Sequence, residues 1–259
     1  LTPLNAQEYM FIMDEARANQ GSALFDWEDK VINGNDFLSN NFAGNLGTEY
    51  GEYVWNKIEN GWEGTDWIDE MTQDNAPVQS HSLNITGSSD NIIYGAGFSY
   101  FDQTGMLGGD ITDAGYRRIT ARLNTEFVLF ANDNFDILKV GENFTYSNTE
   151  NRSVATGGIY WNDLHDALVT NPLMPLRWDN ENMNPHTNGY SPTLEGVSRN
   201  QQNPIAQMYY RHNFNWGKGN TVVGNVFAEI QPIEDLVIRS SFGMDSWFGN
   251  SRSYAPTYQ

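Results

Sequence analysis

Cysteine is absent from this chain of 259 residues, which excludes disulfides and cysteine-ligated metal centres. Positive charge is also scarce, because 14 Lys and Arg stand against 33 Asp and Glu and leave a formal net charge of -19. A surface of this kind repels phosphate backbones, so the composition argues against nucleic acid as a partner.

Long apolar runs are missing too, since no segment approaches the roughly 18 apolar residues that a membrane-spanning helix requires. This excludes helical insertion but not a membrane β-barrel, whose strands need only about 9 to 11 residues each. The chain begins at Leu1 without the basic and apolar regions of a signal peptide. We therefore expect a fragment that is truncated at both ends.

What the chain does contain is aromatic residues, at 14%, and 24 glycines, a combination that favours β-strands joined by tight turns. Residues 1–76 differ from the rest. Asn5 followed by Glu8 forms a capping-box signature, and Gly21 is a stop signal, so we expect an N-terminal helix. A second short helix is predicted near residues 52–59, within an otherwise ordered loop region.

From residue 77 onward the hydrophobic period changes to two, which is typical of half-buried strands. In the segment at residues 118–129, Leu123 and Phe127 share one face, whereas Arg122 and Asn124 share the other. The same pattern predicts one apolar set on the membrane side: Ala96, Phe98, Leu123, Phe127, Val140, Phe144, Val226 and Ala228. The opposite, lumen-facing set is Arg118, Arg122, Asn124, Glu126, Lys139 and Asn143. Glu142 falls among the apolar set, so we expect it near a membrane interface or at a bulge.

The connections alternate in length. Residues 88–91, 131–134 and 232–235 are short polar turns, whereas residues 102–115 and 150–203 are long. Short turns on one side and long loops on the other are typical of outer-membrane barrels, although a soluble β-sandwich also alternates polar and apolar residues. Strand runs much longer than the usual 5 or so residues, with aromatic ends, favour the barrel.

Several runs then resemble a known family. They are GTDWIDE at residues 64–70, APVQSHSLNITG at 76–87, SYFDQTG at 99–105, RITARLN at 118–124 and NPIA at 203–206. Together they resemble the early barrel region of SusC-like TonB-dependent outer-membrane transporters. The resemblance implies a plug domain in the lumen, contact with TonB, a SusD-like surface lipoprotein and import of oligosaccharides, or of peptides in some members. A plug, a TonB-contacting segment and a terminal aromatic strand are not found in this sequence.

The predicted fold is therefore all-β, as part of a large antiparallel transmembrane β-barrel with long extracellular loops and short helices. About six strands are present, whereas the smallest membrane barrels have about 8 and plugged transporters about 22. An open edge in lipid leaves backbone groups unsatisfied, so the remaining strands must come from elsewhere. The predicted divisions are an extracellular loop region at 1–76, four barrel strands at 77–149, a long extracellular loop at 150–205 and further barrel strands at 206–259.

Two local predictions refine this plan. Residues 163–169 should form a short helix in the longest loop, because Leu164, Ala167 and Leu168 make an apolar stripe. Counting membrane crossings predicts that residues 207–231 are one strand-like element, bulged at residues 217–219, and that the turn at 232–235 lies with the other short turns. A hairpin at residue 217 is the alternative.

Catalytic and metal-binding patterns were not found. The histidines His81, His165, His186 and His212 are scattered without a ligand-pair spacing. Residues 179–182 are rich in oxygen ligands, but the following residues do not fit a calcium-binding loop. The sequence therefore predicts no enzyme, no metal and no cofactor.

Ligand contact is assigned to two tryptophans in the longest loop, Trp161 and Trp178, because flat indole faces stack on sugar rings. Anchoring of their own loop is the alternative role for each. Arg118, Arg122, Asn124 and Glu126 either line the passage or contact the plug, and the second is the more economical expectation. Three classes of function stay open: a transporter of oligomeric nutrients, a soluble β-sandwich that binds carbohydrate or acts as an adhesin, and an enzyme.

Overall fold

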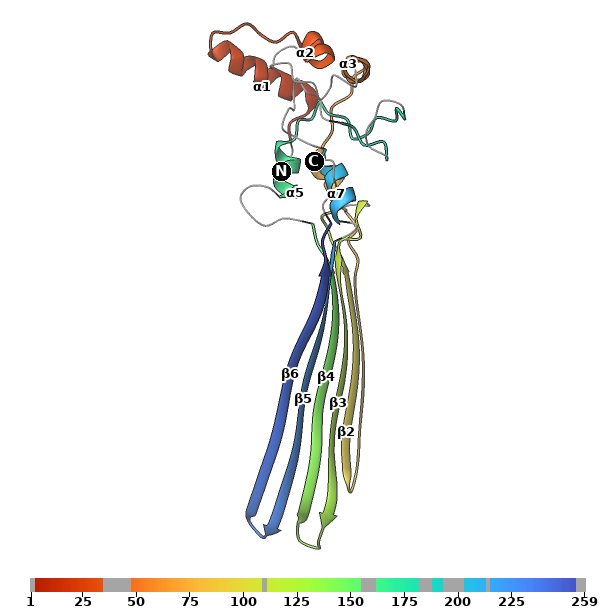
Figure 1. Ribbon diagram of the computed structural model, residues 1–259, viewed down its shortest axis with the longest axis vertical. Helices are drawn as coiled ribbons and strands as arrows, with labels where there is room; N and C mark the ends of the chain where they lie inside the picture. Colours follow the sequence, from red (N-terminus) through yellow and green to blue (C-terminus); the bar gives the residue numbers. More distant parts are fainter. Residues whose placement is uncertain are drawn as a thin grey trace.

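The computed structural model describes residues 3–34, 48–108, 111–154, 162–181, 188–192, 203–212 and 215–254. The chain has two regions, a group of helices at one end and a long, gently curved sheet that extends away from it (Figure 1). The helices are α1 (Ala6–Asn19), α2 (Trp27–Asn33), α3 (Glu49–Glu59), α4 (Trp67–Met71), α5 (Asp163–Val169) and α7 (Pro204–His212). The strands are β1 (Val78–Ser89), β2 (Ile92–Thr104), β3 (Gly115–Ala131), β4 (Asp136–Arg152), β5 (Trp216–Ile233) and β6 (Leu236–Arg252).

The sheet is a simple antiparallel meander in the order β1-β2-β3-β4-β5-β6. The turns β1–β2, β3–β4 and β5–β6 lie at the far end, whereas the longer connections β2–β3 and β4–β5 lie at the end that carries the helices (Figure 1). This confirms the predicted separation of short turns from long loops. Within the described residues β1 and β6 have no strand on their outer sides, so this part of the sheet is open at both edges.

Turn chemistry explains the short connections. The Asn132 side-chain oxygen accepts hydrogen bonds from the backbone N–H groups of Asn134 and Phe135, each at 2.8 Å. Asp235 adopts a left-handed φ of 67°, which Asp tolerates better than most residues because its short side chain bonds locally. Because these turns are tight, each strand pairs with the strand that follows it in the sequence.

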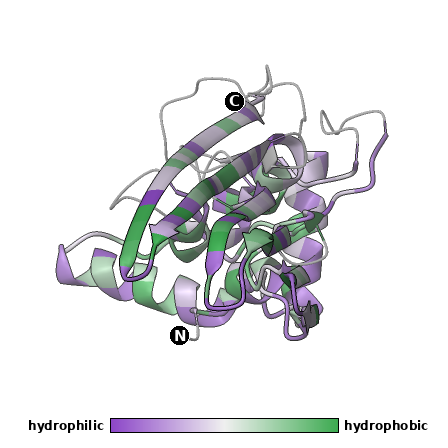
Figure 2. Ribbon diagram, turned by 90° about the horizontal axis from the view of Figure 1, so that it is seen from below, coloured by the Kyte–Doolittle hydropathy of each residue, from purple (hydrophilic) through white to green (hydrophobic). Residues whose placement is uncertain are grey.

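The strand register fixes which residues share a face. Leu123 on β3 lies opposite Ala96 on β2 and Phe144 on β4, whereas Asn124 lies opposite Gly95 and Asn143. Residues opposite each other in an antiparallel pair project to the same side of the sheet. All eight predicted apolar positions therefore share one face, and the predicted polar positions share the other. Hydrophobic and hydrophilic stretches accordingly alternate along the strands in Figure 2.

The apolar face of the sheet is uncovered. Phe98, Val226 and Phe242 are 49%, 54% and 70% exposed, and the described residues supply no second sheet against them. A β-sandwich would bury this face in an internal core. The sandwich alternative is therefore not favoured. A contiguous apolar surface of this kind instead marks contact with lipid or another protein.

Glu142 corrects one prediction. It lies on the apolar face between Thr125 and Val226, in unbroken register with both neighbouring strands. The irregularities in pairing occur elsewhere, between Val128 and Ala131 and between residues 230 and 233. Of the two alternatives, a bulge at Glu142 is wrong because its pairing is regular on both sides, whereas a position near a membrane interface stays a prediction.

The helical region is built from two segments that are far apart in sequence. The backbone N–H of Thr65 donates to the carbonyl of Pro172 at 2.9 Å, and its hydroxyl donates to Met174 at 2.7 Å. The indole N–H of Trp67 donates to Asn171 at 3.1 Å. Residues 3–76 and 162–212 thus form one unit above the sheet. The sequence had suggested two separate loop regions.

Local signals account for most of these helices. Asn5 and Glu8 form a complete capping box, with hydrogen bonds of 2.8 and 3.0 Å, and Gly21 follows α1 with a φ of 73°. The predicted helices at 52–59 and 163–169 are confirmed as α3 and α5. Both α2 and α4 were missed, although each begins at an aspartate N-cap, because seven and five residues show too little periodicity.

The segment before β5 was partly misread. Residues 207–212, predicted as strand, belong to helix α7, whose start is capped when the Asn203 oxygen accepts from the N–H groups of Ile205 and Ala206. β5 begins at Trp216 and pairs regularly through residues 217–219, so the predicted bulge there is also wrong. The prediction that this segment runs along the sheet only once is confirmed, because β5 is a single strand. The turn at residues 232–235 lies with the other short turns, as predicted (Figure 1).

Two hydrophobic cores hold the helical region together. The first joins α1, α2 and α3 through Tyr50 and Val54 to Leu173 and Trp178. The second joins Trp67 and Met71 of α4 to α5, α7 and the segment around Tyr190. No helix among the described residues is both long and apolar enough to cross a membrane.

Candidate functional site

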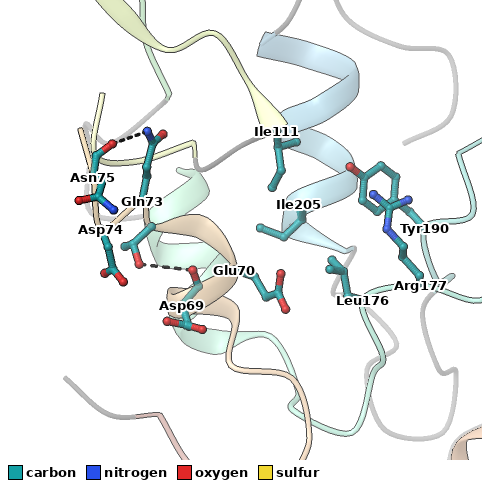
Figure 3. A pocket seen from close by; sticks show the side chains of 11 residues that line it. Asp69, Glu70, Gln73, Asp74, Asn75, Ile111, Leu176, Arg177, Tyr190 and Ile205 are labelled. Atoms are coloured by element: carbon teal, nitrogen blue, oxygen red, sulfur yellow. Dashed lines mark hydrogen bonds between the residues drawn. The ribbon is translucent and has the colours of Figure 1, made fainter. Parts of the chain in front are cut away.

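One candidate site is a pocket of about 450 Å³ in the second half of the helical region (Figure 3). On one side it is lined by α4 and the segment that follows this helix. On the other side it is lined by Leu176, Arg177 and Tyr190 together with the start of α7. Its lining combines carboxylates, amides, one arginine and apolar side chains. The lining residues are Asp69, Glu70, Thr72, Gln73, Asp74, Asn75, Ile111, Leu176, Arg177, Tyr190 and Ile205.

The acidic wall is set by the start of α4. The Asp66 carboxylate accepts from the backbone N–H groups of Ile68 and Asp69, each at 3.0 Å, and so fixes the first turn of the helix. After the helix, the N–H of Gln73 donates to the carbonyl of Met106 at 2.9 Å. This bond ties the pocket to the connection between β2 and β3.

The opposite wall is set by Arg177 and Tyr190. The Arg177 guanidinium lies 4.3 Å from the centroid of the Tyr190 ring, and one of its N–H groups donates to the carbonyl of Asn188 at 2.5 Å. The carbonyl of Leu176 accepts from Ser191 N–H and from the Asn203 side chain, each at 3.0 Å. These hydrogen bonds fix the irregular backbone that forms this wall of the pocket.

Electrostatics distinguish Glu70 within this pocket. Desolvation raises the pKa of Glu70, the negative charge of Asp69 raises it further, and the positive charge of Arg177 acts in the opposite direction. Burial likewise raises the pKa of Tyr190, while the nearby Arg177 lowers it. The pocket therefore contains a partly desolvated carboxylate whose pKa is affected by the charge of a guanidinium that lines the same pocket.

A second hollow, of about 750 Å³, lies on the polar face of the sheet toward the short turns. Asn124, Asn143 and Asn225 lie directly opposite one another on β3, β4 and β5. Beside this asparagine row, the Arg239 guanidinium lies 3.8 Å from the Phe227 ring centroid and 3.5 Å from the Glu229 carboxylate. The hollow presents amides and charges with one buried aromatic ring.

The residues proposed from sequence fall into three places. Arg118, Arg122, Asn124 and Glu126 share the polar face of β3, and of these Asn124 and Glu126 line the hollow. Trp178 is only 5% exposed, and its ring packs against Tyr50 and Tyr53 at centroid distances of 4.8 and 6.5 Å. Its indole faces are thus occupied by the first core, as the anchoring role requires. Trp161 lies outside the described residues.

The pocket near Arg177 was not found from the sequence. Its walls come from residues 69–75, 111, 176, 177, 190 and 205, and no local pattern connects these segments. Among the described residues, no group of three or more His, Cys, Asp or Glu side chains is placed to hold a metal ion.

Comparison with known proteins tests the resemblance seen in the sequence. No family model matches the chain. A TonB-dependent receptor of Formosa agariphila is 28% identical over 193 residues, which cover 74% of this chain and 17% of that receptor. The RagAB peptide importer in its "closed-closed" state shares the fold with a TM-score of 0.63 at 23% identity, covering 96% of this chain and 26% of the matched chain. Its "open-open" state gives a TM-score of 0.55 over 87% of this chain and 25% of that one.

The match thus spans about a sixth of the length of the receptor and about a quarter of the importer chain. An open six-stranded meander with one uncovered apolar face agrees with a partial barrel from a larger protein. Sequence similarity to a TonB-dependent receptor and a fold shared with the RagAB importer support the resemblance of this chain to a fragment from the barrel region of a SusC-like TonB-dependent transporter.

Proposed function

We propose that this chain forms part of the wall and part of the outer cap of a TonB-dependent importer of oligosaccharides or other oligomeric nutrients in the bacterial outer membrane. The observation that carries the proposal is the register of the sheet. Across all six strands it places apolar residues on one uncovered face and polar residues on the other. A β-sandwich also has an apolar and a polar face but buries the apolar one, whereas a wall between lipid and an aqueous or protein-filled lumen leaves its apolar face uncovered by protein.

The apolar face is assigned to lipid and the polar face to the lumen. Placing Arg118 and Arg122 on the lipid side would cost about 2–4 kcal/mol each near the bilayer midplane. The asparagine row (Asn124, Asn143 and Asn225) makes no side-chain hydrogen bond to another described residue. Its free amides suit contact with the protein's own plug domain, since amides both donate and accept.

The helical region is assigned to the extracellular side, above the strand ends that carry the long connections. There it would meet a SusD-like surface lipoprotein and the incoming ligand, while TonB would act from the opposite side on a part of the protein outside this chain. The compared proteins are named as a receptor and a peptide importer, which favours a transport role over an enzymatic one. Trp161 stays a candidate ligand contact.

Uptake by cells that carry the full-length protein tests this proposal. Fluorescent oligosaccharides and peptides should enter the periplasm only when the protein is present, and a protonophore that removes the TonB energy source should stop entry. Membrane fractionation of the same cells should recover the protein with the outer membrane. Recovery as a freely soluble periplasmic protein would instead favour the β-sandwich alternative.

A further inference from the structure

The pocket near Arg177 carries opposite charges on opposite walls. Glu70 extends from α4 toward the side formed by Leu176 and Arg177, whereas Asp69 and Asp74 point away from it (Figure 3). Among the described residues, Glu70 and Arg177 form no ion pair within 4.0 Å of each other, although the positive charge of Arg177 acts to lower the pKa of Glu70. A cavity of about 450 Å³ lies between them.

We propose that this pocket binds both charged groups of a small zwitterionic ligand with an apolar side chain, such as a dipeptide or a free amino acid. The ligand ammonium would lie against Glu70, and its carboxylate would accept hydrogen bonds from Arg177. The inference deepens the proposed import function and rests on it only for the site's access from outside the cell.

Arg177 is suited to the carboxylate end. A guanidinium has five N–H donors in a planar fork that matches a carboxylate, and the bonds to the Asn188 carbonyl and the Tyr190 side chain use only part of them. Its position over the Tyr190 ring holds the fork in one orientation, so less conformational freedom is lost on binding. A lysine would keep the charge but not this geometry.

Glu70 is suited to the ammonium end. Its carboxylate is partly desolvated and is repelled by Asp69, and an incoming positive charge relieves both effects. A neutral sugar would cover both charged groups without neutralising either, which is unfavourable because desolvated charges require partners. The charge pattern therefore separates zwitterions from neutral oligosaccharides.

The remaining wall is apolar and limits size. Ile111, Leu176 and Ile205 line the pocket together with the Tyr190 ring. A volume of about 450 Å³ falls within the usual range for small-molecule sites, of about 300–1,000 Å³. It suits one or two amino-acid residues and an aliphatic side chain better than a long polymer.

Calorimetric titration of the full-length detergent-solubilised transporter tests the inference with four probes. These are leucyl-leucine, its N-acetyl derivative, its C-terminal amide and maltose. We expect leucyl-leucine to bind, each singly blocked derivative to bind at least about ten-fold more weakly, and maltose not to bind at this site. Equal affinities for the three peptides, tighter binding of maltose, or no binding of any probe at millimolar concentration would overturn the inference.

Three variants assign the effect to this pocket. Glu70→Gln should weaken leucyl-leucine about ten-fold and leave the acetylated peptide unchanged, because that peptide has no ammonium to lose. Arg177→Lys should weaken leucyl-leucine but not the amide. Glu59→Gln, at the exposed end of α3, removes an equal charge outside the pocket and should change nothing. A Glu70→Gln protein that binds all probes like the wild type would refute the assignment.

The two proposals fail separately. Selective zwitterion binding without any uptake by cells would leave the pocket assigned and overturn the import function. TonB-dependent uptake together with unselective binding in the calorimeter would keep the import function and remove the pocket assignment.

Discussion

The helical region and the sheet treat their large apolar side chains in opposite ways. In the helical region Trp67, Met71 and Met208 are almost completely buried, each at 1% exposure or less. In the sheet Phe98 and Phe242 are 49% and 70% exposed. One chain thus contains a part that is folded for water and a part whose apolar face needs a different neighbour. The difference is what a membrane wall with an aqueous cap requires.

The two regions also differ in how they are connected. Each strand of the sheet pairs with its neighbour in sequence, so local turns suffice to order it. The helical region joins residues 3–76 to residues 162–212 through hydrogen bonds such as Thr65 to Pro172. Its two halves are separated by four strands, so its contacts join segments that are distant in sequence.

The largest expected effect comes from removing a large buried side chain from the second hydrophobic core of the helical region. Trp67→Ala removes a ring that is 1% exposed and its hydrogen bond to Asn171, which should cost about 3–5 kcal/mol. Hydrogen exchange of the full-length protein should show faster exchange in residues 162–181 and unchanged exchange in the strands. Phe11→Ala, at a position 69% exposed on α1, is the matched control. Equal loosening of both regions would contradict their independence.

The next effect comes from placing a charge on each face of one strand. Leu123→Arg should cost about 2–4 kcal/mol of barrel stability, whereas Asn124→Arg, one residue further on the polar face, should cost little. Refolding of the full-length protein into lipid vesicles, followed by denaturant titration, measures both. Similar costs for the two arginines would remove the distinction between lipid and lumen faces.

A smaller effect is expected at the start of the cap. Asn5→Ala removes one half of the α1 capping box and should cost about 1 kcal/mol, since the N–H of Glu8 loses its 2.8 Å acceptor. Glu8→Ala alone and in combination completes a double-mutant cycle. A coupling energy of zero between the two residues would show that the box does not act as a unit.

The smallest effect has the opposite sign. Glu142→Leu replaces a carboxylate on the apolar face, in register with Thr125 and Val226, and should stabilise the barrel by about 1 kcal/mol. The same vesicle titration measures it. Destabilisation by this change would mean that Glu142 has a polar partner in the complete barrel.

The pattern of the sheet could be predicted from sequence because its signal is local. A period of two assigns Leu123 and Asn124 to opposite faces without knowledge of any other strand. The capping box at Asn5 and the apolar stripe of α5 are equally local. Helix α7 was misread because its aromatic residues, Tyr209 and Tyr210, favour strands, and only the packing of the helix against the second core, in which both tyrosines take part, decides the matter.

The pocket could not be predicted from the sequence, and the sequence could not decide between the two roles of Trp178. Glu70 and Arg177 are brought together by a fold in which α4 packs against a segment about a hundred residues later, and nothing in either segment encodes that distance. Trp178 looked like an exposed aromatic in a loop, yet Tyr50 and Tyr53 from α3 cover it. Contacts between distant segments decide both cases.

Spin-label accessibility along β3 tests the central claim most directly. The chain has no cysteine, so single nitroxides can be attached at each position from 119 to 127 in a full-length protein freed of any other cysteine. In lipid vesicles, labels at 121, 123, 125 and 127 should collide mainly with oxygen, which dissolves in lipid. Labels at 120, 122, 124 and 126 should be shielded from it. Equal accessibility to a water-soluble relaxant at odd and even positions would contradict a membrane wall.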